Sequence, residues 1–91
     1  MYTKGRKKGT IRFAIDPGNG ARSVLLAGDF NQWQPARMRR RKGGGFAAVV
    51  PLGPGTYEYK FVVDEHWLLD RDHSSWAANP YGTLNSVAYV E

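Results

Sequence analysis

Residues 56–64 read TYEYKFVVD, and this stretch decides the fold. Its odd-numbered positions are aromatic or β-branched: Tyr57, Tyr59, Phe61 and Val63. Successive side chains of a β-strand point to opposite faces, so this set is predicted to face a core. Lys60 and Val62 would then share the outer face of the same strand.

Short runs of similar composition occupy much of the remaining chain. They lie at residues 10–15, 22–27, 46–50, 67–69 and 86–90. Glycine- and proline-rich turns separate them at residues 17–20, 43–45 and 53–55. Short strands at close spacing with turn signals between them indicate an antiparallel β-sandwich or barrel. No segment combines a helical period with helix caps.

The turn after residue 64 decides where Trp67 points. If Glu65 and His66 form a two-residue loop, Asp64 pairs with Trp67, and directly opposed residues share a face. Trp67 then lies on the outer face with Lys60. A three-residue loop would pair Trp67 with a core-facing residue and bury the indole. The sequence alone leaves both registers open.

Length and composition indicate one small domain. The chain has 91 residues and no cysteine, which suits a reducing compartment. Residues 1–8 offer charge but little to bury, so we expect a flexible basic tail followed by one domain over residues 9–91. Because no apolar run reaches spanning length and no signal peptide is visible, we expect a cytoplasmic protein without a membrane partner.

The net charge of +5 is unevenly distributed. Two basic clusters, within residues 4–8 and 37–42, hold nine of the 13 Lys and Arg residues. Such clusters can bind phosphates, but they also serve as solvated tails and loops. Because no nucleic-acid-reading motif accompanies them, the sequence favours solvated charge over a nucleic-acid partner.

The sequence predicts no catalytic group, no metal site and no cofactor. Glycoside hydrolysis needs two carboxyl groups held across a sugar, whereas Asp64 and Glu65 sit at a predicted hairpin tip. His66 and His73 do not have the spacing of a common metal site. The protein is therefore not expected to be an enzyme.

The three tryptophans occupy positions that a small core does not require. Trp33 follows a strand within a polar, turn-like stretch, Trp67 follows a hairpin tip, and Trp76 lies in a loop. An exposed indole can stack on the apolar face of a pyranose ring. A loop tryptophan can equally anchor its loop against the core, and position alone leaves both roles open.

Three ordered motifs resemble the isoamylase-type, glycogen-binding modules of carbohydrate-binding module family 48. Residues 26–33, LAGDFNQW, resemble the family's "aGdFNxW" signature, and residues 54–67 resemble its "pG.y.YkFvvDg.W" block. Residues 79–87, NPYGTLNSV, resemble the "np.G..Nsv" segment. The resemblance covers almost the whole chain and implies an immunoglobulin-like antiparallel β-sandwich. Such modules occur in glycogen branching enzymes and in the β subunit of AMP-activated protein kinase.

The resemblance also implies a carbohydrate-binding site. Its positions in this chain are Trp33, Lys60, Trp67, Tyr81, Thr83 and Asn85. The two tryptophans would stack on glucose rings, while Lys60, Thr83 and Asn85 would bond sugar hydroxyls. Glu65 and Tyr81 depart from the family pattern, which often has glycine and leucine at these positions.

The implied function is non-catalytic binding of α-glucan, meaning glycogen, starch-like polymers or maltooligosaccharides. Some modules of this family have lost sugar binding and instead dock a partner such as a glycogen-metabolising enzyme, and this is the alternative. The retained Trp33, Lys60, Trp67 and Asn85 favour sugar binding.

Overall fold

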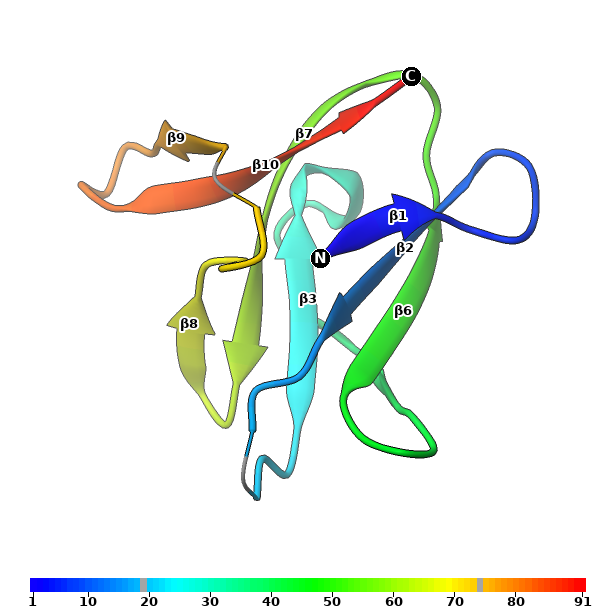
Figure 1. Cartoon of the computed structure of the whole chain (residues 1–91). Helices are drawn as coiled ribbons and strands as arrows, with labels where there is room; N and C mark the ends of the chain where they lie inside the picture. Colours follow the sequence, from blue (N-terminus) through cyan, green and yellow to red (C-terminus); the bar gives the residue numbers. More distant parts are fainter. Residues whose placement is uncertain (19, 74) are drawn as a thin grey trace.

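The computed structural model describes residues 1–18, 20–73 and 75–91, and in them two antiparallel β-sheets face each other (Figure 1). The first sheet has the order β1 (Tyr2–Lys4), β2 (Thr10–Ile15), β6 (Phe46–Pro51) and β5 (Arg39–Arg40). The second has the order β4 (Ala36–Arg37), β3 (Val24–Gly28), β7 (Gly55–Val63), β10 (Leu84–Val90) and β9 (Trp76–Ala78). The strand β8 (His66–Leu68) also pairs with β7. The predicted all-β antiparallel sandwich is confirmed.

Aromatic residues from both sheets meet in the core. The rings of Phe13 on β2 and Tyr59 on β7 lie 4.9 Å apart edge to face, and Tyr59 contacts Phe61 in the same way. All three are fully buried, as are Val24 and Leu26 on β3. Burying a side chain of this size stabilises the fold by about 1.5–3 kcal/mol. The alternation in residues 56–64 therefore indicates correctly that Tyr59 and Phe61 on β7 face the core.

All six predicted strands are present, with ends shifted by up to two residues. The structure adds four short strands (β1, β4, β5 and β9) and a 3-10 turn, η1 (Asp29–Asn31). Strands β4 and β5 form one crossover, because Met38 between them is buried and its N–H bonds to Val24 O at 2.8 Å. No helix in the described ranges is long and apolar enough to span a membrane.

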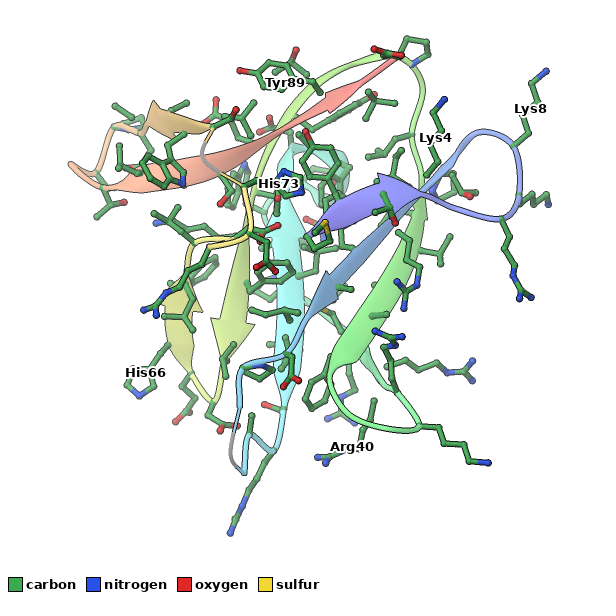
Figure 2. The ribbon with its side chains drawn as sticks, viewed as in Figure 1. Lys4, Lys8, Arg40, His66, His73 and Tyr89 are labelled. Atoms are coloured by element: carbon green, nitrogen blue, oxygen red, sulfur yellow. The ribbon has the colours of Figure 1, made fainter. Side chains whose placement is uncertain are left out.

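The N-terminal segment differs from the expectation of a flexible tail over residues 1–8. Residues 2–4 form β1 and pair with β2. Tyr2 contacts the rings of Phe13 and Tyr59 and stacks on His73 at 4.3 Å, and Figure 2 shows His73 beside β1. The expectation fails at residues 2–4 because Tyr2 supplies an apolar surface that the high charge of this segment obscures.

The β7–β8 turn is formed by Asp64 and Glu65, so neither register considered from the sequence occurs, and the two-residue loop lies one residue earlier than Glu65–His66. Both residues have positive φ, 46° and 74°, and Val63 pairs with His66. Positive φ at both central positions is the mark of the type I′ turns that join tight hairpins. The Asp64 carboxylate accepts bonds from the backbone N–H groups of Arg22 and Ser23, which fixes the turn against the segment leading into β3.

The shifted register leaves Trp67 on the outer face. Trp67 pairs with Val62 rather than with Asp64. Because these two β7 positions differ by two residues, they share a face of the strand. The indole is 50% exposed, so of the two orientations that the sequence left open, Trp67 has the outward one.

Candidate functional site

A hollow of about 570 Å³ lies on the outer face of the second sheet. Its lining consists of Trp33, Lys60, Trp67, Asn79, Pro80, Tyr81, Thr83 and Asn85. The structure therefore brings together all six residues that the sequence singled out. We call this hollow the tryptophan groove.

Trp33 is held by the residues that precede it in the chain. Its indole Nε1–H donates to the Asp29 carboxylate at 3.0 Å, and its backbone N–H donates to Gly28 O at 2.9 Å. The other oxygen of Asp29 accepts from the backbone N–H of Glu58 at 2.7 Å, which ties the loop to β7. Gln32 and Trp33 both have positive φ, 56° and 59°, a backbone conformation that these bonds must maintain.

Gly28 and Asn31 complete this support. A Cβ on Gly28 would lie 2.7 Å from both the backbone oxygen of Glu58 and the ring of Phe30, so a side chain has no room there. Asn31 accepts from the Gly28 N–H and donates to Leu26 O, both at 3.0 Å. The motif GDFNQW thus forms a compact brace that orients one indole.

Trp67 reaches the groove from β8. Its β7 partner Val62 also pairs with Leu25 on β3, so Leu25, Val62 and Trp67 form a row across the outer face. Val62 is 6% exposed although its side of the strand faces outward. This row gives the indole an apolar neighbour and leaves about half of its surface open.

Thr83 lies at the centre of the polar wall of the groove. Its hydroxyl oxygen accepts from Lys60 Nζ at 3.2 Å and from Asn79 Nδ2 at 2.6 Å. A threonine hydroxyl has two acceptor lone pairs and one donor, so both acceptor positions are occupied. The hydroxyl proton remains for an outside acceptor such as a sugar oxygen.

Asn79 organises the loop that closes one side of the groove. Its side-chain oxygen accepts from the N–H groups of Tyr81 and Thr83, and its amide nitrogen also donates to the side chain of Asn85 at 3.0 Å. Gly82, with φ 81°, allows the tight bend, and Tyr81 at its tip is 90% exposed. The sequence analysis did not select Asn79 or Pro80 as site residues, although both belong to the NPYGTLNSV motif.

Asn85 connects this network to the sheet. Its side chain is 7% exposed, accepts from Asn79 and donates to Glu58 Oε1 at 3.0 Å. One amide hydrogen of Asn85 therefore remains without a partner in this network. Together, Lys60, Thr83 and Asn85 present hydrogen-bond donors beside two indoles, which is an arrangement suited to a ring with an apolar face and a rim of hydroxyls.

Asp64 and Asp70, two carboxylates outside the groove, have structural roles. Hydrogen bonds from the Ser23 and Arg22 amides lower the pKa of Asp64 below its ordinary value of 3.8. Asp70 is 1% exposed, accepts from the Tyr59 hydroxyl at 2.6 Å, and its N–H donates to Ser86. Burial, and then the bond to Asp70, raises the pKa of Tyr59 well above its usual range. Across the described ranges, no three His, Cys, Asp or Glu residues gather as metal ligands.

Most of the chain matches the model of a known protein family. Residues 11–91 match the model described as the glycogen recognition site of AMP-activated protein kinase. The chain belongs to this family. The matched segment contains every residue of the tryptophan groove.

Individual relatives agree with this assignment. The chain is 32% identical over 72 residues to the pig 5'-AMP-activated protein kinase subunit beta-1, which covers 79% of this chain and 57% of the relative. It is 43% identical over 53 residues to the Arabidopsis thaliana chloroplastic protein PTST homolog 2, which covers 57% of this chain and 10% of the relative. The chain thus spans only part of each of these proteins.

A solved structure supports the fold. A maltogenic amylase from S. marinus superposes on the whole chain with a TM-score of 0.77 and 24% identity, and the match covers 15% of the amylase. The likeness supports an immunoglobulin-like β-sandwich, and the family makes this chain a carbohydrate-binding type of module.

Proposed function

We propose that this chain binds α-glucan without transforming it, and that the tryptophan groove is the binding site. One observation carries the proposal: two indoles from separate elements, Trp33 after β3 and Trp67 on β8, border the same hollow as the donors Lys60 and Thr83. Membership of a glycogen recognition family supports glycogen, starch-like polymer or maltooligosaccharide as the ligand.

Each part of the groove has a role in this proposal. Trp33 and Trp67 stack on glucose rings, while Lys60, Thr83 and Asn85 donate to hydroxyls. Tyr81, which is almost fully exposed, would contact the sugar from the protruding loop. Because Thr83 accepts from Lys60 and Asn79, its hydroxyl proton is oriented before the sugar arrives.

The open shape of the groove implies weak binding. An open site makes few desolvated contacts, and ordering a flexible chain opposes association. We expect Kd values on the order of micromolar to millimolar, which correspond to about −8 to −4 kcal/mol.

A calorimetric titration with maltoheptaose tests the proposal. Wild-type protein should bind, and Trp33→Ala and Trp67→Ala should each weaken both this binding and retention by glycogen in native gels. Trp76→Ala is the matched control, because Trp76 is 52% exposed but does not line the groove. If both groove variants bind like wild type while remaining folded by circular dichroism, the site assignment is wrong.

The second candidate function is docking of a glycogen-metabolising enzyme, supported by relatives of which the matched segment covers only a part. In that case glycogen, amylose and maltoheptaose would all fail to bind to the folded protein. Neither candidate gives the chain a catalytic role.

A further inference from the structure

The two sides of the sandwich differ sharply in charge. Residues 1–16 and 38–54, which contain all four strands of the first sheet, carry nine Lys or Arg residues and one Asp. The remaining residues carry four Lys or Arg and seven Asp or Glu. The tryptophan groove lies on the second sheet, so the basic residues are concentrated on the side away from it.

The fold joins basic clusters that lie about 30 residues apart in the sequence. Strands β2 and β6 pair from Thr10 opposite Pro51 to Ile15 opposite Phe46. The loop with Lys7 and Lys8 therefore adjoins one end of these strands, and the loop that begins at Arg41 adjoins the other. In Figure 2 the labelled Lys4 and Lys8 lie at one end of this sheet and Arg40 at the other.

Arginines also occupy the outer face between these ends. Arg12 pairs with the exposed Val49, and Arg39 pairs with Ala47, which lies on the same side of β6 as Val49. A shallow hollow of about 610 Å³ lies over Ala47 and Val49 and is lined by four arginines, including Arg39 and Arg41. We call Lys7, Lys8, Arg12, Arg39 and Arg41 the basic face.

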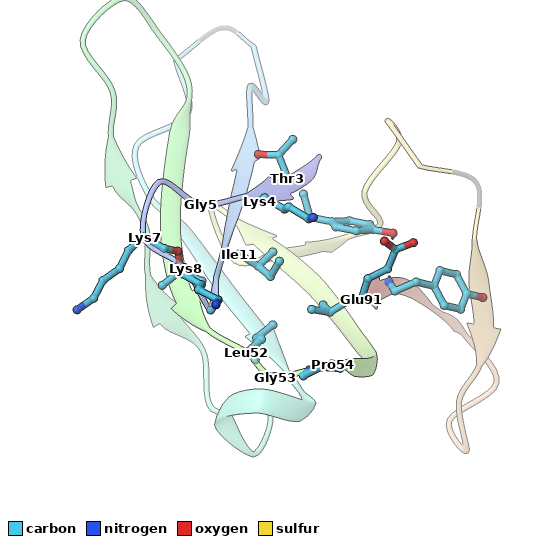
Figure 3. A pocket seen from close by; sticks show the side chains of 15 residues that line it. Thr3, Lys4, Gly5, Lys7, Lys8, Ile11, Leu52, Gly53, Pro54 and Glu91 are labelled. Atoms are coloured by element: carbon cyan, nitrogen blue, oxygen red, sulfur yellow. Dashed lines mark hydrogen bonds between the residues drawn. The ribbon is translucent and has the colours of Figure 1, made fainter.

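Within the described residues, no carboxylate forms an ion pair with the basic face. The ion pairs found among the described residues both involve the amino group of Met1, with Asp70 and Asp72. Figure 3 shows the side chain of Lys7 extending away from the hollow between the N-terminal loop and the end of β10. Arg40 differs, because it donates to Ala21 O and Arg22 O and lies over the ring of Phe46.

The chemistry of this face fits a phosphodiester backbone better than an acidic protein surface. Protein interfaces are enriched in aromatic anchors, whereas Val49 is the one large exposed hydrophobic side chain among the described residues of β2, β5 and β6. Arginine forks match phosphate oxygens. Six-residue strands separate the two ends by about 20 Å, a length over which duplex nucleic acid carries about 12 negative charges.

We propose that the basic face binds the phosphodiester backbone of a nucleic-acid duplex without reading its sequence, on the opposite side of the module from the tryptophan groove. The outer face of the first sheet presents no exposed aromatic ring on β2, β5 or β6 on which unpaired bases could stack. This site goes beyond the proposed glucan binding and does not depend on it. The sequence alone favours solvated charge, because only the fold brings both clusters to the border of one sheet.

Fluorescence anisotropy with labelled 16-base-pair DNA and RNA duplexes tests this proposal. If five phosphates are contacted, log K should fall against log salt with a slope of about −4.5. Affinity should then drop on the order of 500-fold between 50 and 200 mM salt. Binding of both duplexes indicates recognition of the phosphodiester backbone. Binding of only one duplex still supports the site and shows that it prefers the helix geometry of that duplex.

A matched pair of charge reversals distinguishes duplex binding by the basic face from attraction by the net charge of the protein. Arg39→Glu and Arg71→Glu both replace an exposed arginine and change the net charge equally. Arg39→Glu should weaken duplex binding about tenfold at 50 mM salt and make the salt slope shallower by about one. Arg71→Glu should change affinity less than twofold, and both variants should retain wild-type maltoheptaose binding, which reports the fold and the groove.

Three outcomes would overturn the proposal. Equal weakening by both reversals would show attraction by net charge alone. Tighter binding of polyglutamate than of either duplex would assign the face to an acidic protein partner. Absence of duplex binding at 50 mM salt would leave the face without a phosphodiester ligand. If the wild-type protein binds the duplexes but not maltoheptaose, the proposed glucan function is contradicted and the proposed duplex binding is not.

Discussion

Asp29 should control glucan affinity although it does not line the tryptophan groove. Its carboxylate accepts from Trp33 Nε1 at 3.0 Å and from the Glu58 N–H at 2.7 Å. Asp29→Ala removes both bonds and leaves the indole with fewer restraints on its orientation. We therefore expect the substitution to weaken glucan binding without deleting any group that touches the sugar.

The magnitude follows from preorganisation. Immobilising a flexible side chain on binding costs about 0.5–1.5 kcal/mol. The hydrogen bond to Asp29 avoids this cost for Trp33, because it orders the indole before the sugar binds. The variant should therefore raise the maltoheptaose Kd about twofold to thirteenfold, since 1.4 kcal/mol is a factor of ten. Both bonds are exposed, so the expected loss of folding stability is about 1–2 kcal/mol.

A double-mutant cycle isolates the contribution of the indole bond. Trp33→Phe keeps an aromatic ring but removes Nε1, and calorimetry would compare both single variants with the double variant. Asp29→Ala should weaken binding in the wild-type background and have little further effect beside Trp33→Phe. Equal losses in the two backgrounds, or an unchanged Kd for Asp29→Ala, would refute the argument that Asp29 acts by positioning Trp33.

Three further predictions concern the turns that support the groove. Gly28→Ala should destabilise the fold by about 1–3 kcal/mol in urea denaturation and weaken glycogen retention, because the new Cβ meets Glu58 O at 2.7 Å. Glu65→Gly should raise stability by about 0.5–1 kcal/mol with unchanged maltoheptaose affinity, because φ at this position is 74°. Because the pKa of Asp64 is lower in the folded protein, its ionised carboxylate stabilises the fold at pH values above the ordinary pKa of 3.8, and this stabilisation is lost as the pH falls through the pKa of the folded state. Asp64→Asn should therefore make the free energy of unfolding less dependent on pH in that range, as measured by acid denaturation.

The sequence predicted the parts of the fold that depend on alternation. Residues 56–64 assign Tyr59 and Phe61 to the core, and both are fully buried. The family motifs selected six residues that the fold places around one hollow. Their mutual approach could not be derived from periodicity, because Trp33, Trp67 and Thr83 come from separate loops and strands whose distances depend on sheet order.

The features that the sequence did not predict are short or depend on distant partners. Strands β4 and β5 contain two residues each, and their assignment follows from Met38 being buried at the crossover. Strand β1 depends on contacts of Tyr2 with Phe13 on the next strand and with His73, which is 71 residues away. Asn79 was missed because its role lies in hydrogen bonds to Tyr81, Thr83 and Asn85, and no pattern in the sequence indicates these bonds.

The β7–β8 hairpin shows why a shift in register need not change the face that a side chain occupies. The two-residue register considered from the sequence has its turn at Glu65–His66, and the structure has it at Asp64–Glu65, with both residues at positive φ. Each version has two loop residues, so the partner of Trp67 moves by two positions, from Asp64 to Val62. Side-chain direction in a strand repeats every two residues, so the indole stays on the face that carries Lys60. A three-residue loop would have moved the partner by one and buried Trp67, which makes the number of loop residues, rather than their identity, the feature on which the groove depends.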